Sequence, residues 1–411
     1  MRIIAGIMSV MIAITFVGAA WILAMVLGSF DSWLSIVGLL LGLGLSLALL
    51  ELVRRLGWIE LFFVNLRMLL FADAVAYNNR GLYMLDRGVL DRAMDDFDEA
   101  ITLDSNLAVA FSNRCLTWIC QRELDNAIKD ANVAIQLDPN LPHAYSNRAL
   151  ALIGKSELDL AIEDCDESIR LAPRFAEGYA NRATAHLQNM MFEHALSDAN
   201  CALDFDPRKQ IVYETRANAL FNLGFFKEAA SDFTRALKYT PEEPPLLSGR
   251  GLARHRLGQY RQALADYNEA VRLWGDGPGA AVIYNNRGFT YHAIGRFNDA
   301  VIDYERAVQL DENHPNAYKN YAWLLATCPD DNYRDGQRAV QLATKAHDLI
   351  DWQQTPWLYI LAAAYAESGQ FPQAIQWQQK TIEAAAEEDR QVEEDRLKLY
   401  QAGQPIRESA T

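Results

Sequence analysis

The sequence predicts an all-α protein: a solenoid of about nine helical hairpins, preceded by two transmembrane helices. Two observations carry this prediction. A pattern of small and aromatic residues returns about every 34 residues through most of the chain. Two long uncharged apolar runs occupy the first fifty residues. We therefore divide the chain into a membrane hairpin (1–53), an amphipathic segment (54–73), the repeats (74–386), and a charged capping helix with a frayed tail (387–411).

The membrane hairpin is predicted from residues 3–50. Residues 3–30 and 32–50 contain no Asp, Glu, Lys or Arg, and a membrane-spanning helix needs roughly 20 apolar residues. Only a short turn separates the two runs, so the helices must be antiparallel. A cleaved signal peptide is the weaker interpretation, because its apolar stretch is roughly 7–15 residues long and is not followed at once by a second run.

The basic residues around these runs predict the orientation of the hairpin. Arg2 precedes the first run, Arg54 and Arg55 follow the second, and the turn between them carries only Asp31. Positive charge favours the cytoplasmic side of a membrane. We expect an integral two-pass protein with both ends, and therefore the repeats, in the cytoplasm.

Two features of this region leave alternatives open. Gly38, Gly42 and Ser46 form a stripe of small residues that allows close helix packing, either within the hairpin or between two copies of the chain. Residues 58–72 are apolar with scattered charges. They predict either a helix lying at the membrane interface or a cap over the first repeat.

Charge and cysteine usage narrow the classes of partner and site. The formal net charge is −15, and residues 1–73 are neutral, so the deficit lies in the repeats. Such an acidic surface disfavours nucleic acid, whose phosphates need Lys and Arg. The five cysteines show no CxxC and no zinc-type spacing with His. We interpret them as free, buried thiols and expect no cofactor.

The repeats are defined by positions that stay in phase. One Ala marks each repeat, at Ala93, Ala127, Ala161, Ala195, Ala229, Ala263, Ala300, Ala339 and Ala374. A small residue generally lies twelve positions earlier, at Gly81, Cys115, Ala149, Ala183, Ala217, Gly251, Gly288, Ala322 and Ala362. A large residue lies four positions before that, at Tyr77, Phe111, Tyr145, Tyr179, Tyr213, Leu247, Tyr284, Tyr318 and Leu358. Small residues allow two helices to pack closely, and no single hairpin buries its apolar faces alone, so neighbouring hairpins stack.

These positions, with Pro139, Pro173, Pro207 and Pro241 closing four repeats, resemble the tetratricopeptide repeat family over residues 74–386. The resemblance implies a right-handed solenoid with a concave groove lined by the first helix of each repeat. It also implies that this groove holds peptides or partner proteins.

A charge pair recurs at a fixed spacing of sixteen residues. An Arg immediately precedes the small residue in seven repeats, at Arg80, Arg114, Arg148, Arg182, Arg216, Arg250 and Arg287. The matching acids are Asp96, Asp130, Asp164, Asp198, Asp232, Asp266 and Asp303. Both partners are lost together in the last two repeats. We predict bidentate structural pairs between the two helices of a repeat; the alternative is an Arg row offered to an acidic ligand.

Partner-binding residues are expected on the first helix of each repeat, where the early repeats present apolar residues beside small polar ones. The candidates are Asn78, Leu82, Leu85, Ser112, Leu116, Ile119, Ser146, Leu150, Ile153, Asn218, Phe221, His255 and His292. We expect a protein or peptide partner, and the repeats nearest the anchor leave open a partner that is itself a membrane protein.

The function predicted from these features is that of a membrane-anchored scaffold that assembles proteins and catalyses nothing. No Ser/His/Asp set, metal cluster or nucleotide-binding loop stands out. His255 and His292 occupy equivalent positions but lack further metal ligands. The alternatives are a membrane organiser that oligomerises through its hairpin, and an enzyme with an unrecognised site in the groove.

Overall fold

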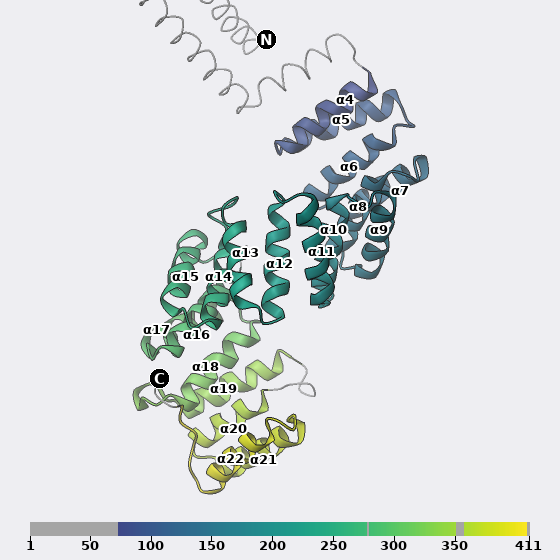
Figure 1. The fold of residues 1–411 in the computed structure, drawn as a ribbon. Coiled ribbons are helices and arrows are strands. Elements are labelled where there is room, and N and C mark those ends of the chain that lie inside the picture. The colour runs from purple at the N-terminus through teal and green to yellow at the C-terminus, as the bar shows by residue number, and fades with distance from the viewer. Residues whose placement is uncertain (1–72, 278, 351–356, 409–411) are drawn as a thin grey trace, which may run out of the picture. The chain divides into compact units, whose positions relative to one another are not determined.

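A computed structural model describes residues 73–277, 279–350 and 357–408, which are all-α (Figure 1). The predicted membrane hairpin and nearly all of the amphipathic segment lie outside the described residues. In the described ranges, no helix combines the length and apolar character needed to cross a membrane. The helices are α4 (Ala74–Asp86), α5 (Leu90–Leu103), α6 (Ala108–Cys120), α7 (Leu124–Leu137), α8 (Pro142–Gly154), α9 (Leu158–Leu171), α10 (Ala176–Gln188), α11 (Phe192–Phe205), α12 (Gln210–Asn222), α13 (Phe226–Ala236), α14 (Pro244–Arg256), α15 (Tyr260–Trp274), α16 (Ala280–Ala293), α17 (Phe297–Leu310), α18 (Pro315–Thr327), the 3₁₀ turn η1 (Asp331–Tyr333), α19 (Gly336–Asp348), α20 (Leu358–Glu367), α21 (Phe371–Ala384) and α22 (Arg390–Gln401).

The chain divides into two compact units, residues 1–156 and 157–411. In the first unit, the hairpins α4–α5 and α6–α7 are followed by α8, and each helix packs on the next one along the chain. In the second unit, α9 precedes six hairpins, from α10–α11 to α20–α21, and α22 packs on α21. Within each unit the first helices of successive hairpins, which we call helices A, also contact one another. The second helix of each hairpin is helix B.

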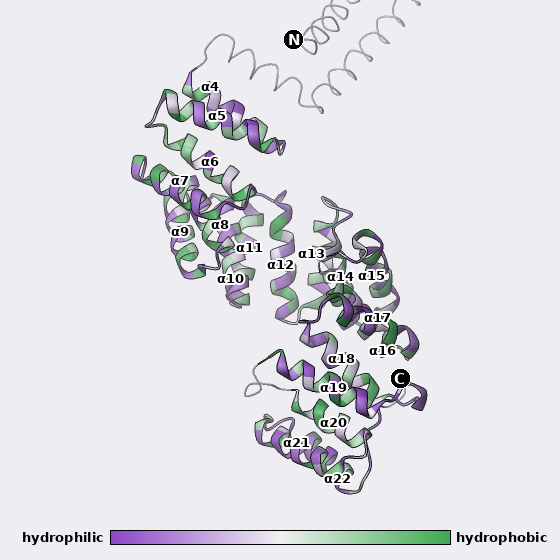
Figure 2. Ribbon diagram, turned by 180° about the vertical axis from the view of Figure 1, so that it is seen from behind, coloured by the Kyte–Doolittle hydropathy of each residue, from purple (hydrophilic) through white to green (hydrophobic). Residues whose placement is uncertain are grey.

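The small residues that mark the repeats lie at the helix contacts, as predicted. All nine marker alanines, from Ala93 to Ala374, are fully buried. The small residues on helices A are buried as well. Hydrophilic and hydrophobic residues alternate along the same helices (Figure 2), so each helix has a packed face and an exposed face.

Sixteen residues after the small position of helix A, helix B carries partners of different size; Phe233 in the fifth repeat lies opposite an alanine, Ala217. A Cβ atom added to Gly81 would lie 2.6 Å from the Phe97 ring, and one added to Gly251 would lie 2.8 Å from the Tyr267 ring. Where helix A has Ala183 instead, helix B has Ala199 at the equivalent position. The volume of the pair is thus shared differently between the two helices from repeat to repeat.

The turn between helices A and B, except that between α18 and α19, places one residue in the left-handed region of φ. Five of these residues are glycines, Gly88, Gly224, Gly258, Gly295 and Gly369. Arg122, Ser156 and Met190 occupy the equivalent position at φ of 63°, 62° and 57°. The geometry of the hairpin, rather than the residue type, therefore imposes this conformation.

The C-terminal segment differs from the expected frayed tail. Helix α22 leaves Val392 and Leu399 exposed, while Tyr400 is buried in a cluster with Ala362 and Ala374. Gly403 then takes a φ of 68°, and residues 404–408 continue without helix. Glu408 is held by hydrogen bonds to residues of α18. The tail therefore returns onto the solenoid through Glu408.

Candidate partner-binding face

The predicted Arg–Asp pairs are present as bidentate ion pairs. Arg114 donates from Nε and Nη2 to the two carboxylate oxygens of Asp130, both at 2.7 Å. The same fork joins Arg80 to Asp96, Arg182 to Asp198, Arg216 to Asp232, Arg250 to Asp266 and Arg287 to Asp303. The six carboxylates are buried. Arg148 and Asp164 fall in different units, so their pairing stays a prediction.

The third guanidinium nitrogen makes a contact that the sequence analysis did not predict. Arg114 Nη1 donates to Asp98, on helix B of the preceding repeat, at 2.6 Å. Its counterparts reach the same position: Arg148 bonds Asn132, Arg182 bonds Asp166, Arg216 bonds Asn200, and Arg250 bonds Thr234. Each Arg therefore ties its own hairpin to the previous one. The sequence contained a sign of this second contact, because a polar residue lies two positions after most of the paired aspartates.

The fixed orientation of these side chains makes them structural. The guanidinium also lies over the large residue three positions earlier, at 5.4 Å for Arg114 and Phe111. Burial opposes the charge of Arg287, but its bonds to Asp303 raise the pKa of the guanidinium overall. Arg114, Arg182, Arg216, Arg250 and Arg287 each have all three donor nitrogens bonded to other side chains, which argues against an Arg row offered to a ligand.

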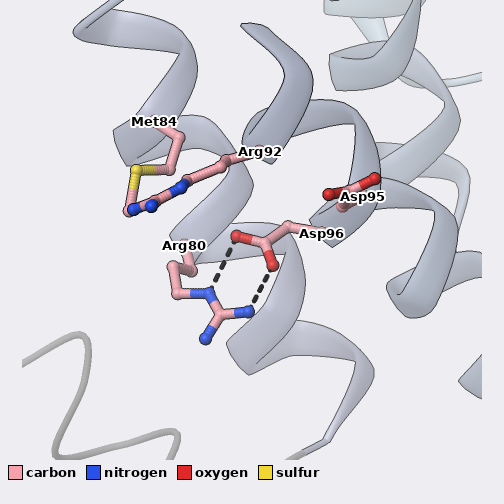
Figure 3. A pocket seen from close by; sticks show the side chains of 5 residues that line it. All are labelled: Arg80, Met84, Arg92, Asp95 and Asp96. Atoms are coloured by element: carbon pink, nitrogen blue, oxygen red, sulfur yellow. Dashed lines mark hydrogen bonds and ion pairs between the residues drawn. The ribbon is translucent and has the colours of Figure 1, made fainter. Parts of the chain in front are cut away.

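The first repeat ends the ladder with a shallow cavity of about 330 Å³ (Figure 3). Arg80 and Asp96 form the fork at one wall, and Met84, Arg92 and Asp95 complete the lining. Arg80 Nη1 makes no hydrogen bond to any residue of the described ranges. In later repeats the Arg Nη1 group donates to helix B of the preceding hairpin. The first repeat differs because the described residues contain no hairpin before α4.

The polar members of the predicted site lie in a seam between successive helices A. Asn113 donates to Asn78 Oδ1 at 2.9 Å, and Asn147 donates to the hydroxyl of Ser112 at 3.0 Å and to its carbonyl at 2.9 Å. Asn320 repeats this contact on Asn285. Each bond spans 35 residues, so it joins neighbouring repeats. Asn78, Ser112 and Ser146 are buried. Asn78 and Ser112 thus take part in bonds that hold neighbouring hairpins together.

Apart from the two histidines, the remaining residues of the predicted site are apolar except for Asn218. They lie on the same side of helices A and differ in how far they are exposed. Leu82 is 38% exposed. Leu85, Leu116, Ile119, Leu150, Asn218 and Phe221 are half-buried, whereas Ile153 is buried. In each unit the exposed members belong to one helical side, because the positions are spaced three, four and three residues apart. Counting from the large residue of each helix A, these are positions −2, +1, +5 and +8, which we call the helix-A face.

Position −2 of this face was missed by the sequence analysis. It is occupied by exposed apolar residues in four repeats: Val75 and Val109 in the first unit, and Ile211 and Val282 in the second. Val109 is 41% exposed, although it lies on the same helical side as half-buried Leu116. The spacing of 109, 112, 116 and 119 was sufficient to include it. The first unit therefore has three exposed apolar side chains, Val75, Leu82 and Val109, on the same side of its helices A.

The two candidate histidines are buried and have separate environments. His255 Nδ1 lies 3.0 Å from the Thr290 hydroxyl and the ring packs against Phe289. Burial, assisted by the charge of Arg256, lowers the pKa of His255 to about 4. His292 Nε2 lies 2.8 Å from Glu408 Oε2. Across the described residues, no three His, Cys, Asp or Glu side chains converge as metal ligands.

All five cysteines are free, as predicted, but they are not all buried. Cys115, Cys165 and Cys328 are buried, Cys201 is half-buried, and Cys120 is exposed at the end of α6. Burial raises the pKa of the Cys115 thiol to about 12. The buried thiols are therefore protonated and unreactive near neutral pH.

The comparisons with known proteins agree with this architecture. Residues 242–313, which contain helices α14 to α17, match the family model of the tetratricopeptide repeat. No curated protein matches the chain. The fold is thus built from helical hairpins like those of tetratricopeptide-repeat proteins, a class typical of protein-interaction scaffolds.

Among solved structures, the chain is similar to the APC/C hetero-tetramer Cut9–Hcn1, at 12% identity and a TM-score of 0.56, over 70% of this chain and 55% of that one. It is also similar to YrrB, described as a TPR protein with an unusual peptide-binding site, at 20% identity and a TM-score of 0.40, over 46% of this chain and 95% of that one. A third match is PilF of Pseudomonas aeruginosa, at 15% identity and a TM-score of 0.46, over 52% and 96%. At these identities the likeness concerns the fold alone.

Proposed function

We propose that this protein is a membrane-anchored scaffold that binds a segment of a partner protein on the helix-A face of its first unit. The observation that carries the proposal is the group of exposed apolar side chains at Val75, Leu82 and Val109, on helices tied together by the buried polar seam. A rigid apolar surface suits an amphipathic helix or an apolar segment, because little freedom is lost when the partner docks.

The contacts that hold α4, α6 and α7 together do not involve the exposed apolar side chains, so these side chains are available for binding. Asn78 and Asn113 fix α4 against α6, and the Arg114 fork fixes α6 against α7. Val109 and Leu82 make neither contact. Replacing them should change what the surface binds without changing how the helices stack.

Capture of partners from detergent-solubilised membranes tests the proposal. The wild-type chain should retain at least one membrane protein that is lost from Leu82→Asp plus Val109→Asp, because a carboxylate within an apolar interface costs several-fold in affinity. The matched control is Leu103→Asp plus Val89→Asp, which alters two exposed apolar residues away from this face. Identical protein sets from wild type and the Leu82/Val109 variant, with unchanged melting temperature, would reject the proposal.

The anchor is proposed from the uncharged runs 3–30 and 32–50 and from the basic residues beside them. With both ends of this hairpin in the cytoplasm, the first unit lies close to the membrane, so a membrane protein is the partner we favour. A reporter fused after Thr411 should be active in the cytoplasm. Activity only on the opposite side would refute this orientation.

We also propose that the chain has no catalytic activity of its own. This proposal rests on the use of the strongest polar groups within the structure: the Arg–Asp forks join the two helices of a hairpin, and the asparagine seam joins neighbouring hairpins. His255 is held neutral near pH 7 by burial and faces a threonine hydroxyl rather than a nucleophile paired with a third group.

A further inference from the structure

The C-terminal tail lies on the helix-A face of the second unit. Glu408 donates its backbone N–H to the Thr327 carbonyl at 2.9 Å. Its carboxylate accepts a hydrogen bond from Trp323 Nε1 at 2.5 Å through one oxygen, and the other oxygen lies 2.8 Å from His292 Nε2. One residue of the tail is therefore recognised through its main chain and through both carboxylate oxygens.

The two residues before Glu408 have their own binding contacts. Ile406 packs against the cluster of Ala362, Ala374 and Tyr400. Arg407 Nη1 lies 2.7 Å from Glu367, which also pairs with Arg334 at 3.1 Å. Three consecutive side chains are thus bound by different parts of the second unit, as in the recognition of an extended peptide.

The groups that hold Glu408 belong to the positions where a partner was expected. His292 is at position +8 of α16, equivalent to Leu85 of the first repeat. Trp323 is at position +5 of α18, equivalent to Leu82, and its ring packs edge-on against Tyr359 at 5.2 Å. The tail therefore occupies the helix-A face in the way that a segment of another protein would occupy it.

Positive charge also lies on α18, one helical turn before Trp323. Lys319, at position +1 of α18, lies with its ammonium 4.6 Å from the centre of the Trp357 ring. Burial and then the charge of Arg256 lower the pKa of Lys319. Within the described ranges, neither Lys319 nor Arg256 is paired with a carboxylate. Although the chain as a whole is acidic, this part of the face offers unpaired positive charge.

Burial opposes the charge of Glu408, and its bonds to His292 and Trp323 more than offset this, so that the pKa of the carboxyl falls below its ordinary value. The site thus stabilises the ionised carboxylate although it is partly removed from water. A neutral amide of the same shape would lose this advantage, because hydrogen bonds to an ionised group are about twice as strong as neutral ones.

We propose that the helix-A face of α16 and α18 is a recognition site for an extended segment of a partner protein that places a carboxylate side chain between His292 and Trp323, and that the C-terminal tail is its displaceable internal ligand. This proposal rests on the proposed scaffold function and adds the chemistry of a second partner segment. Because the tail is tethered close to the site, it competes at an effective concentration of the order of millimolar. A partner segment must displace the tail, so the tail raises the concentration of partner needed for binding.

Fluorescence anisotropy with a labelled peptide of residues 401–411 tests this proposal on the full-length chain in detergent. Wild type should bind the peptide weakly, because its own tail is bound. Glu408→Gln should release that tail and bind the peptide at least ~10-fold more tightly. A peptide carrying Gln at position 408 should lose ~10-fold in affinity for this variant, as expected for loss of a charged hydrogen-bonded pair. Adding Trp323→Phe should weaken binding by removing the Nε1 donor while keeping an aromatic ring.

Two controls separate recognition from a purely structural cap. Glu388→Gln changes an exposed carboxylate away from the site and should bind the peptide as wild type does. Ile406→Ala plus Arg407→Ala weakens the tail without altering the groups around Glu408, and serves as a second release variant if Glu408→Gln is unstable. If both release variants melt normally but fail to bind the peptide, or bind the Gln peptide equally well, the proposal is overturned. Loss of partner capture by Leu82→Asp plus Val109→Asp would still support the scaffold function.

Discussion

Tyr321 donates a hydrogen bond from its hydroxyl to Glu305 Oε1 at 2.9 Å, sixteen residues earlier in the chain. Tyr321 stands where the earlier repeats have Arg, and Glu305 stands two residues after Asp303. Arg114 reaches Asp98 across the same interval. The eighth repeat has therefore lost the bond within its own hairpin but retains the bond to the previous one.

Tyr321→Phe should lower the free energy of unfolding of the second unit by about 1 kcal/mol, the usual net value of one hydrogen bond. Urea denaturation followed by circular dichroism measures this difference. Tyr318→Phe is the matched control, because the Tyr318 hydroxyl makes no hydrogen bond to the described residues. Equal effects of the two substitutions would contradict an inter-repeat role for Tyr321.

Arg114→Leu should lower the free energy of unfolding by about 3 kcal/mol, because it leaves the buried Asp130 carboxylate with only the Trp118 N–H as a bonded donor. Thermal melting detects the loss, and Arg92→Leu, at an exposed position of α5, should stay within about 0.5 kcal/mol of wild type. An unchanged melting temperature combined with lost partner binding would instead support the Arg row as a ligand site.

Gly251→Ala should destabilise the second unit by about 1–3 kcal/mol, since the added methyl group meets the Tyr267 ring at 2.8 Å. Combining it with Tyr267→Ala recreates the pair of the fourth repeat, Ala183 with Ala199. The double variant should be more stable than the sum of the single effects by at least about 1 kcal/mol. Strict additivity would show that the two sites do not share volume.

Stability should fall as the pH drops from about 6.5 to about 4, in part through His255. Burial depresses the pKa of His255 to about 4, whereas an unfolded histidine titrates near 6.5. The unfolded chain therefore binds the proton first, so the stability present above pH 6.5 is lost as the pH decreases through this window. His186, His314 and His347 have pKa values shifted in the same direction by burial.

Comparing variants isolates the His255 contribution. The slope of unfolding free energy against pH should be shallower for His255→Gln than for wild type between pH 6.5 and 4. Parallel curves for wild type and His255→Gln would contradict the depressed pKa.

The contacts within a hairpin were predictable from the sequence because the chain contains several copies of each hairpin. The joint loss of Arg and Asp in the last two repeats indicated that the pair is in contact, as the forks from Arg80 to Arg287 confirm. Burial of the marker alanines followed from the same argument, since a small residue kept at one phase marks a close helix contact.

Contacts between hairpins were not predictable in the same way, because they depend on how one hairpin is stacked on the next. In the Asn113–Asn78 bond, Asn113 lies one position beyond the predicted face. From the sequence, the polar atoms of Asn78 could equally have been available to a partner. The tail was missed for a different reason. Trp323 and Glu408 lie 85 residues apart, and no local pattern marks such a pairing.

The most direct measurement of the central claim is photo-crosslinking in native membranes, with a benzoylphenylalanine placed singly at Val109 or Leu103. Both side chains are exposed, but only Val109 lies on the helix-A face. The account predicts a discrete protein adduct from position 109 and none of that mass from position 103. The same adduct from position 103 alone, or from neither position, would contradict binding of a partner on the helix-A face.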